Sequence, residues 1–123
     1  MLAAVYHGPN DLRVENVPKP SIGKDELLVK VLSASVCGTD LRIYHGNHRM
    51  YTPDTVRIPG HEVVGNIAQI GENVSGFNLG QRVFCAPNTG CGHCLQCISG
   101  NNNLCAHYDA IGVTSDGGFA EYV

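Results

Sequence analysis

Four cysteines with zinc-ligand spacing lie in the last third of the chain. They are Cys91, Cys94, Cys97 and Cys105, in the run CGHCLQCISGNNNLC. Two successive C-x-x-C steps and a fourth cysteine allow four thiolates to surround one ion, and zinc is the usual metal of such a tetrahedral cage. A site with four protein ligands is closed to substrate, so we predict a structural zinc here.

A second set of chemically active residues lies upstream, in the runs CGTD and GHE. Cys37, His61 and Glu62 offer a thiolate, an imidazole and a carboxylate, and three such ligands leave a fourth zinc position open for water or substrate. Zinc in an open site lowers the pKa of a bound hydroxyl group. We expect Asp40 to fix the tautomer of the histidine and Thr39 to offer its hydroxyl to the proton of an alcohol.

Short strands must position these residues, because no window of helical length shows an apolar stripe. One short helix is predicted over residues 41–45, with Thr39 or Asp40 as its cap. The Cys-rich segment, about residues 85–108, is predicted to be a loop held by metal. Turns separate the β-like runs and predict a small irregular β-barrel or sandwich, with strands over residues 2–6, 12–17, 26–35, 61–70, 81–86 and 118–123.

The neighbouring His61 and Glu62 pose a geometric problem. Adjacent residues of a regular strand face opposite sides of the sheet, so both reach one metal only if the backbone leaves the pleat. The preceding Pro59 and Gly60 make such a departure cheap. We therefore expect irregular backbone at this point.

Composition indicates a globular domain and argues against several partners. The chain has 123 residues, of which 43% are hydrophobic and 15% charged. A net charge of -3 without a Lys/Arg run argues against nucleic acid and against an anionic membrane. The N-terminus has no signal-peptide pattern, and no apolar stretch approaches a spanning helix. Six cysteines then favour metal over the alternative of a disulfide framework, and we expect a reduced, cytoplasmic protein.

Four segments resemble the zinc-containing alcohol dehydrogenases of the medium-chain dehydrogenase/reductase superfamily. They are VCGTDLRIYHG, IPGHEVVGNIAQIGENV, GQRVFCAPNTGCGHCLQCISGNNNLC and DGGFAEYV. The resemblance implies that residues 1–123 form the family's GroES-like catalytic domain, a mainly β, irregular barrel with a zinc-stapled Cys loop and few short helices. It implies a catalytic zinc at Cys37, His61 and Glu62, with Thr39 beginning the proton relay and Asp40 behind the histidine. It also implies a structural zinc at Cys91, Cys94, Cys97 and Cys105.

The resemblance further implies an enzyme that interconverts an alcohol and its carbonyl by passing a hydride to NAD or NADP. The combination of CGTD with GHE resembles the threonine, polyol and secondary-alcohol branches. The expected partner is a small-molecule alcohol, and the full-length protein is expected to form a homodimer or homotetramer. The alternative is a zinc-binding GroES-like scaffold or interaction module without enzymatic activity.

Two departures from the family pattern bear on activity. Arg42 stands where many relatives carry a relay histidine, so either the relay ends at Thr39 and the cofactor ribose, or His45 substitutes, or Arg42 meets a charged group of cofactor or substrate. The chain also reaches Val123 without a G-x-G-x-x-G motif after a strand. We therefore expect a fragment without the Rossmann cofactor domain, and one that cannot transfer hydride because nothing holds the nicotinamide.

Overall fold

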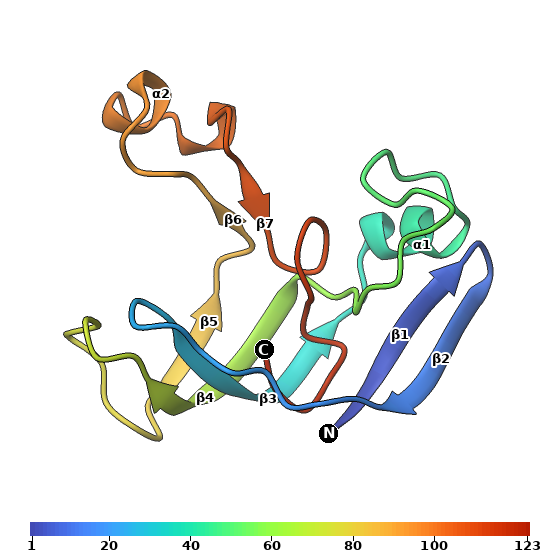
Figure 1. Ribbon diagram of the computed structural model, residues 1–123, viewed down its shortest axis with the longest axis horizontal. Coiled ribbons are helices and arrows are strands. Elements are labelled where there is room, and N and C mark those ends of the chain that lie inside the picture. Colours follow the sequence, from blue (N-terminus) through green and yellow to red (C-terminus); the bar gives the residue numbers. More distant parts are fainter.

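The computed structural model describes residues 1–123 and is mainly β, which confirms the predicted fold class (Figure 1). Its helices are α1 (Gly38–Tyr44), α2 (Leu95–Ile98) and the single-turn 3-10 helix η1 (Asn102–Leu104). None of them is long and apolar enough to cross a membrane. The strands are β1 (Leu2–Gly8), β2 (Asp11–Asn16), β3 (Leu27–Ser35), β4 (Glu62–Ile70), β5 (Arg82–Cys85), β6 (Asn88–Thr89) and β7 (Asp109–Ala110).

The strands form three antiparallel sheets. β3, β4 and β5 make the central sheet, β1 and β2 make a hairpin beside it, and the short β6 and β7 pair at the base of the Cys-rich segment. Gly65 of β4 sits where a Cβ would lie 2.3 Å from the backbone oxygen of Lys30, so glycine is what allows β3 and β4 to approach at this point. The β3–β4 pairing ends with Ser35 opposite Glu62, and this places both residues at the same end of the sheet.

The predicted strand over residues 118–123 is not a continuous strand, and that prediction is wrong. The segment instead divides its hydrogen bonds between two sheets. The amide of Ala4 donates to Phe119 O on one side, at 2.7 Å, and the amides of Val29 and Val123 bond each other's carbonyl oxygens on the other side. Because no single neighbour takes the whole ladder, only isolated bridges form, and these bridges join the hairpin to the central sheet.

The hydrophobic core is small and divided into clusters. Ala3, Val5 and Ile58 form one cluster, and the rings of Tyr6 and Tyr51 pack edge to face beside Ile43 in another. The second cluster connects β1, α1 and the loop that follows α1. It therefore fixes the last turn of α1, the helix that begins next to Cys37, against β1.

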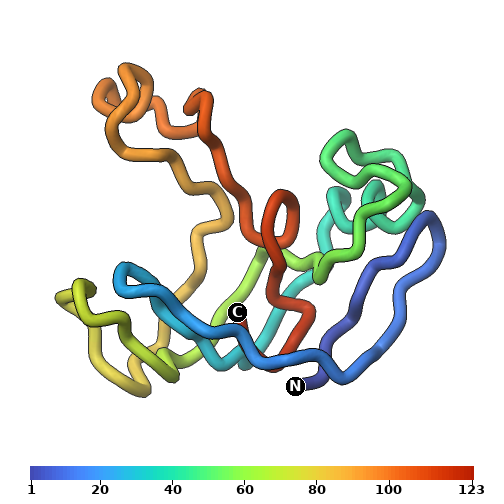
Figure 2. The backbone as a smooth tube through the Cα atoms, viewed as in Figure 1, coloured from blue at the N-terminus to red at the C-terminus, as the bar shows by residue number.

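The segment between β5 and β7 projects from the body of the molecule and returns to it (Figure 2). Neither α2 nor η1 buries a residue. Leu95 and Ile98 of α2 stay 77% and 73% exposed. We call residues 86–108 the Cys lobe. It has almost no apolar core, so its shape depends on whatever brings its cysteines together.

Candidate metal centres

The first centre is built on the start of α1, where Cys37 is the N-cap residue. Its thiol accepts a hydrogen bond from the Thr39 amide, at 3.3 Å, and its own amide donates to the Asp40 carboxylate, at 2.9 Å. This capping box satisfies two backbone amides that the first turn of a helix otherwise leaves free. The predicted cap, Thr39 or Asp40, was wrong by two or three residues, because the thiol of Cys37 takes that role.

Asp40 connects the helix to His61. Its side chain is buried, and its second oxygen lies 3.5 Å from His61 Nδ1. Neither of these two buried atoms has a hydrogen-bond partner. The other ring nitrogen, Nε2, lies 3.0 Å from Cys37 Sγ. An imidazole held by a carboxylate at Nδ1 leaves Nε2 free to bind a metal.

Glu62 completes the first centre, and the backbone before it is irregular, as expected. Gly60 adopts φ 95°, and β4 begins only at Glu62, so His61 lies outside the strand. The pleat therefore does not send the two side chains to opposite faces. The hydroxyl of Ser35 donates to the Glu62 carboxylate across the β3–β4 pairing. Sequence reasoning missed Ser35, because only the strand register places it beside Glu62.

The ligand atoms of Cys37, His61 and Glu62 all lie within 4.8 Å of one another. A sulfur, a nitrogen and an oxygen at this spacing are a donor set that zinc accepts, and three protein ligands leave a position open. Thr39 lies in the first turn of α1 and is half-buried, and its backbone amide bonds Cys37 Sγ. The buried, mutually facing Asp40 and His61 atoms fit the same arrangement, since they leave the metal-binding nitrogen directed at Cys37.

The basic residues around α1, which are His45, His48 and Arg42, have different surroundings. His45 bonds Asn10 through Nδ1 at 3.0 Å, so its ring is tied to the turn between β1 and β2. His48 packs against Tyr51, and burial together with the charges of Arg49 and Arg42 lowers its pKa. A neutral His48 is therefore expected at pH 7. Arg42 is in the last turn of α1 and exposed.

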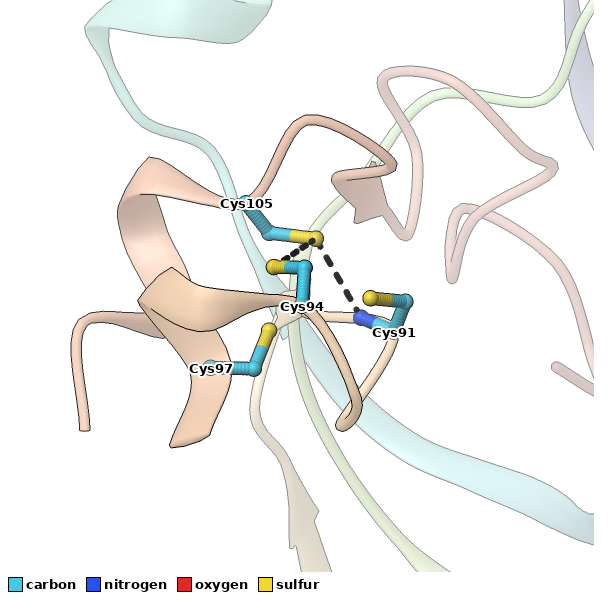
Figure 3. Close-up of side chains that lie close together, drawn as sticks. All are labelled: Cys91, Cys94, Cys97 and Cys105. Atoms are coloured by element: carbon cyan, nitrogen blue, oxygen red, sulfur yellow. Dashed lines mark hydrogen bonds between the residues drawn. The ribbon is translucent and has the colours of Figure 1, made fainter. Parts of the chain in front are cut away.

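The second centre is the Cys lobe. Figure 3 shows its four cysteine side chains pointing toward one another, with Cys94 and Cys97 at the start and within α2. All four sulfurs lie within 4.8 Å of one another, and none is in a disulfide. Two of them, on Cys94 and Cys105, are 3.8 Å apart. A tetrahedron with Zn–S bonds of about 2.3 Å has edges of roughly 3.8 Å, so this spacing matches a zinc cage.

Backbone amides in the Cys lobe favour thiolates. The amides of Cys91 and His107 donate to Cys105 Sγ at 3.3 and 3.2 Å, and the pKa of Cys105 is lowered. The backbone amide of Cys97 lowers the pKa of Cys94 to about 6, whereas burial raises the pKa of Cys97 to about 12. Part of the cage is therefore ready to bind a cation at neutral pH. Cys85, in β5, stays outside both centres, and burial raises its pKa.

Comparison with known proteins identifies the family. Residues 23–123 match the alcohol dehydrogenase GroES-like domain. An L-threonine 3-dehydrogenase of Shewanella woodyi is 40% identical over 111 residues, which are 88% of this chain and 32% of that protein. A sorbitol dehydrogenase of Halalkalibacterium halodurans is 40% identical over 123 residues, which are 99% of this chain and 35% of that protein.

A solved structure agrees with these matches. That structure is of a protein from Sinorhizobium meliloti, which is provisionally assigned as a zinc-binding dehydrogenase and is bound to NADP. It superposes with a TM-score of 0.86 at 40% identity, over 99% of this chain and 35% of that one. The chain thus spans about a third of the length of the relatives it matches. It belongs to the alcohol dehydrogenase GroES-like domain family.

Proposed function

We propose that this chain is the catalytic domain of a zinc- and NAD(P)-dependent oxidoreductase that interconverts an alcohol and its carbonyl. One observation carries the proposal: Cys37, His61 and Glu62 converge within 4.8 Å, with a buried carboxylate behind the histidine. A three-ligand centre of this kind accommodates a substrate oxygen, whereas the four cysteines of the Cys lobe form a closed centre.

In the proposed reaction, each residue of the first centre has a different role. A bound zinc supplies Lewis acidity that makes an alcohol hydroxyl easier to deprotonate. Asp40 holds the imidazole of His61 with Nδ1 directed at its carboxylate, so that Nε2 stays free of a proton. The Thr39 hydroxyl, on the first turn of α1, would accept the proton of the substrate hydroxyl while giving its own proton to the next relay group, the cofactor ribose or His45. Ser35 restrains the Glu62 carboxylate through its hydrogen bond.

The substrate and cofactor classes are inferred from the relatives. The named activities of two of them concern threonine and sorbitol, and the aligned structure holds NADP. We therefore infer a secondary alcohol, a polyol or a threonine-like substrate, and NAD or NADP as the hydride acceptor. We assign residues 1–123 to one catalytic domain that carries the metal-stapled lobe. A homo-oligomer and a cytoplasmic location stay predictions.

Joining this chain to a nicotinamide-binding domain tests the proposal. Residues 1–123 replace the matching segment of the Shewanella woodyi enzyme, and the zinc-loaded hybrid is assayed with threonine, secondary alcohols and polyols for NADH or NADPH formation. We expect turnover from the hybrid and none from residues 1–123 alone, because orientation of the two reactants supplies much of the rate enhancement.

Two cysteine substitutions, one in the first centre and one outside both centres, provide a matched test and control for this assay. Cys37→Ser removes a ligand of the first centre and is expected to abolish turnover, while Cys85→Ser removes a cysteine outside both centres and leaves turnover within about threefold. A folded, zinc-loaded hybrid that turns over none of these alcohols would count against the oxidoreductase and favour the non-enzymatic scaffold.

A further inference from the structure

The Cys lobe has an unbalanced charge when it holds zinc. Four thiolates around one Zn²⁺ leave two formal negative charges on the cage. No Asp, Glu, Lys or Arg occurs in residues 83–108, so the lobe has no fixed cation of its own. Buried or partly buried negative charge is costly without a compensating partner. Water, backbone dipoles and charges from another part of the chain can each compensate it.

Backbone dipoles supply only part of the compensation for the negative charge of the cage. Cys105 receives two amide hydrogen bonds, from Cys91 and from His107. The nearest histidine in sequence, His93, is exposed and uses its Nδ1 on the carbonyl of Cys91. Amide donors stabilise a thiolate, but they carry partial charges and leave the net charge of the cage unchanged.

Arg49 brings a full positive charge to the lobe from a distant segment. It lines a cleft of about 360 Å³ together with the buried Cys105, and it is the only charged residue among the six that line this cleft. The other four are Asn88, Asn103, Leu104 and Tyr108. Arg49 forms no ion pair with any carboxylate of the chain.

The loop that carries Arg49 is well anchored. The amide of Met50 donates to His48 Nδ1, at 3.3 Å, and the amide of Tyr51 donates to His48 O, at 2.9 Å. The buried Tyr51 hydroxyl donates to Gly112 O, at 2.9 Å. The guanidinium therefore projects from a fixed backbone, which lowers the entropy lost when it faces the lobe.

We propose that Arg49 is the counter-cation of the zinc cage in the Cys lobe. It compensates the cage's negative charge across the cleft at Cys105, and it ties residues 48–51 to the lobe when zinc is bound. The inference needs zinc in the Cys lobe and is independent of the proposed oxidoreductase activity.

Zinc release from the lobe tests the inference. Arg49→Gln removes the charge, Arg49→Lys keeps it, and Arg42→Gln removes an equal charge on α1, away from the cleft. Each variant is loaded with zinc, and release to a chromogenic chelator is followed. The same variants are also loaded with Co²⁺ in a Cys37→Ser background, where sulfur-to-cobalt charge-transfer bands come from the lobe alone because the first centre has lost its thiolate.

At low salt we expect Arg49→Gln to release the lobe metal about fivefold faster than the unmodified chain, the upper end of the effect of an exposed charge. Arg49→Lys and Arg42→Gln should stay within about twofold of the unmodified chain. The Arg49→Gln effect should disappear near ~1 M salt, where the screening length is about 3 Å. Circular dichroism checks that each variant is folded.

Two results overturn the inference. Equal release from Arg49→Gln and Arg42→Gln at low salt shows that the guanidinium does not act on the cage. Faster release from Arg49→Gln that salt does not reduce, or that Arg49→Lys shares, shows a packing role for the side chain instead of a charge role.

Discussion

Asp40 has two structural roles. One carboxylate oxygen caps the amide of Cys37 at the start of α1, and the other faces His61 Nδ1. The same side chain therefore contacts both Cys37 and His61, two residues of the proposed first centre. Such carboxylates behind a metal-binding histidine raise metal affinity without touching the metal.

Asp40→Asn separates these tasks. The amide oxygen still accepts from the Cys37 amide, but the NH₂ group then faces His61 Nδ1 and favours the tautomer with the proton on Nε2. We expect affinity for zinc or cobalt at the first centre to fall about 10- to 100-fold, with a loss of unfolding free energy of about 1 kcal/mol or less. Metal competition and urea unfolding measure the two quantities.

The exposed Asp54 gives the control for this experiment, since Asp54→Asn removes the same charge at the surface. It should change neither metal affinity nor stability by more than about 0.5 kcal/mol. Unchanged metal affinity in Asp40→Asn would show that the carboxylate serves only the helix.

At the scale of elements, the turn before β4 decides how the first centre is built. Gly60 has φ 95°, and a Cβ there would lie 2.5 Å from the Phe119 ring. The segment containing Phe119 also binds this turn through its backbone, because Gly118 donates to Gly60 O at 2.8 Å and Phe119 to Pro59 O at 3.0 Å. Backbone freedom and close packing therefore both require glycine at this position.

Gly60→Ala is expected to lower the unfolding free energy by about 3 kcal/mol, from strain at positive φ and from overpacking against Phe119. Gly76→Ala is the matched control, since Gly76 has φ 81° with nothing within 4 Å of its Cβ position. It should lose only about 1 to 2 kcal/mol. Equal losses in urea unfolding would mean that the contact with Phe119 contributes nothing.

At the scale of the whole molecule, the Cys lobe and the rest of the chain, which we call the body, are stabilised by different interactions. The body has a three-stranded sheet and buried apolar clusters, whereas α2 and η1 of the Cys lobe bury no residue. Apart from local hydrogen bonds and the β6–β7 pairing at its base, the lobe depends on metal coordination for its order. The lobe and the body should therefore respond separately to metal removal.

Removing zinc with a chelator is expected to raise amide hydrogen exchange throughout residues 86–108, while β3 and β4 keep their protection. Hydrogen exchange with mass spectrometry, at fixed pH and with and without chelator, measures both regions in one experiment. Loss of protection in β3 and β4 at the same chelator concentration would show that the lobe and the body unfold as one unit.

Acid should have the same effect on the lobe. The pKa of Cys94 is lowered to about 6, so its thiolate takes up a proton as pH falls through this value, and amide hydrogen bonds lower the pKa of Cys105 in the same direction. Zinc competes with those protons, so its affinity for the lobe should decrease steeply below about pH 6. Cobalt charge-transfer absorbance against pH measures this. Absorbance that stays constant to about pH 4 would contradict it.

The sequence by itself predicted the local features of this protein. Cys91, Cys94, Cys97 and Cys105 lie within fifteen residues, so their sulfurs meet largely through short-range geometry. Alternating apolar residues and turn residues predicted the first five strands to within two residues at either end. The motifs predicted the family, which the comparisons confirm.

Contacts between segments that are distant in the sequence could be identified only from the tertiary structure. Cys37 and His61 are 24 positions apart, and the tertiary fold brings Sγ and Nε2 to 3.0 Å. Strand register alone places Ser35 beside Glu62, and the cleft alone places Arg49 beside Cys105. Residues 118–123 read as a strand because their pattern is β-like, yet two competing neighbours divide their hydrogen bonds. Local spacing and propensity act over a few residues, whereas these contacts depend on how whole elements pack.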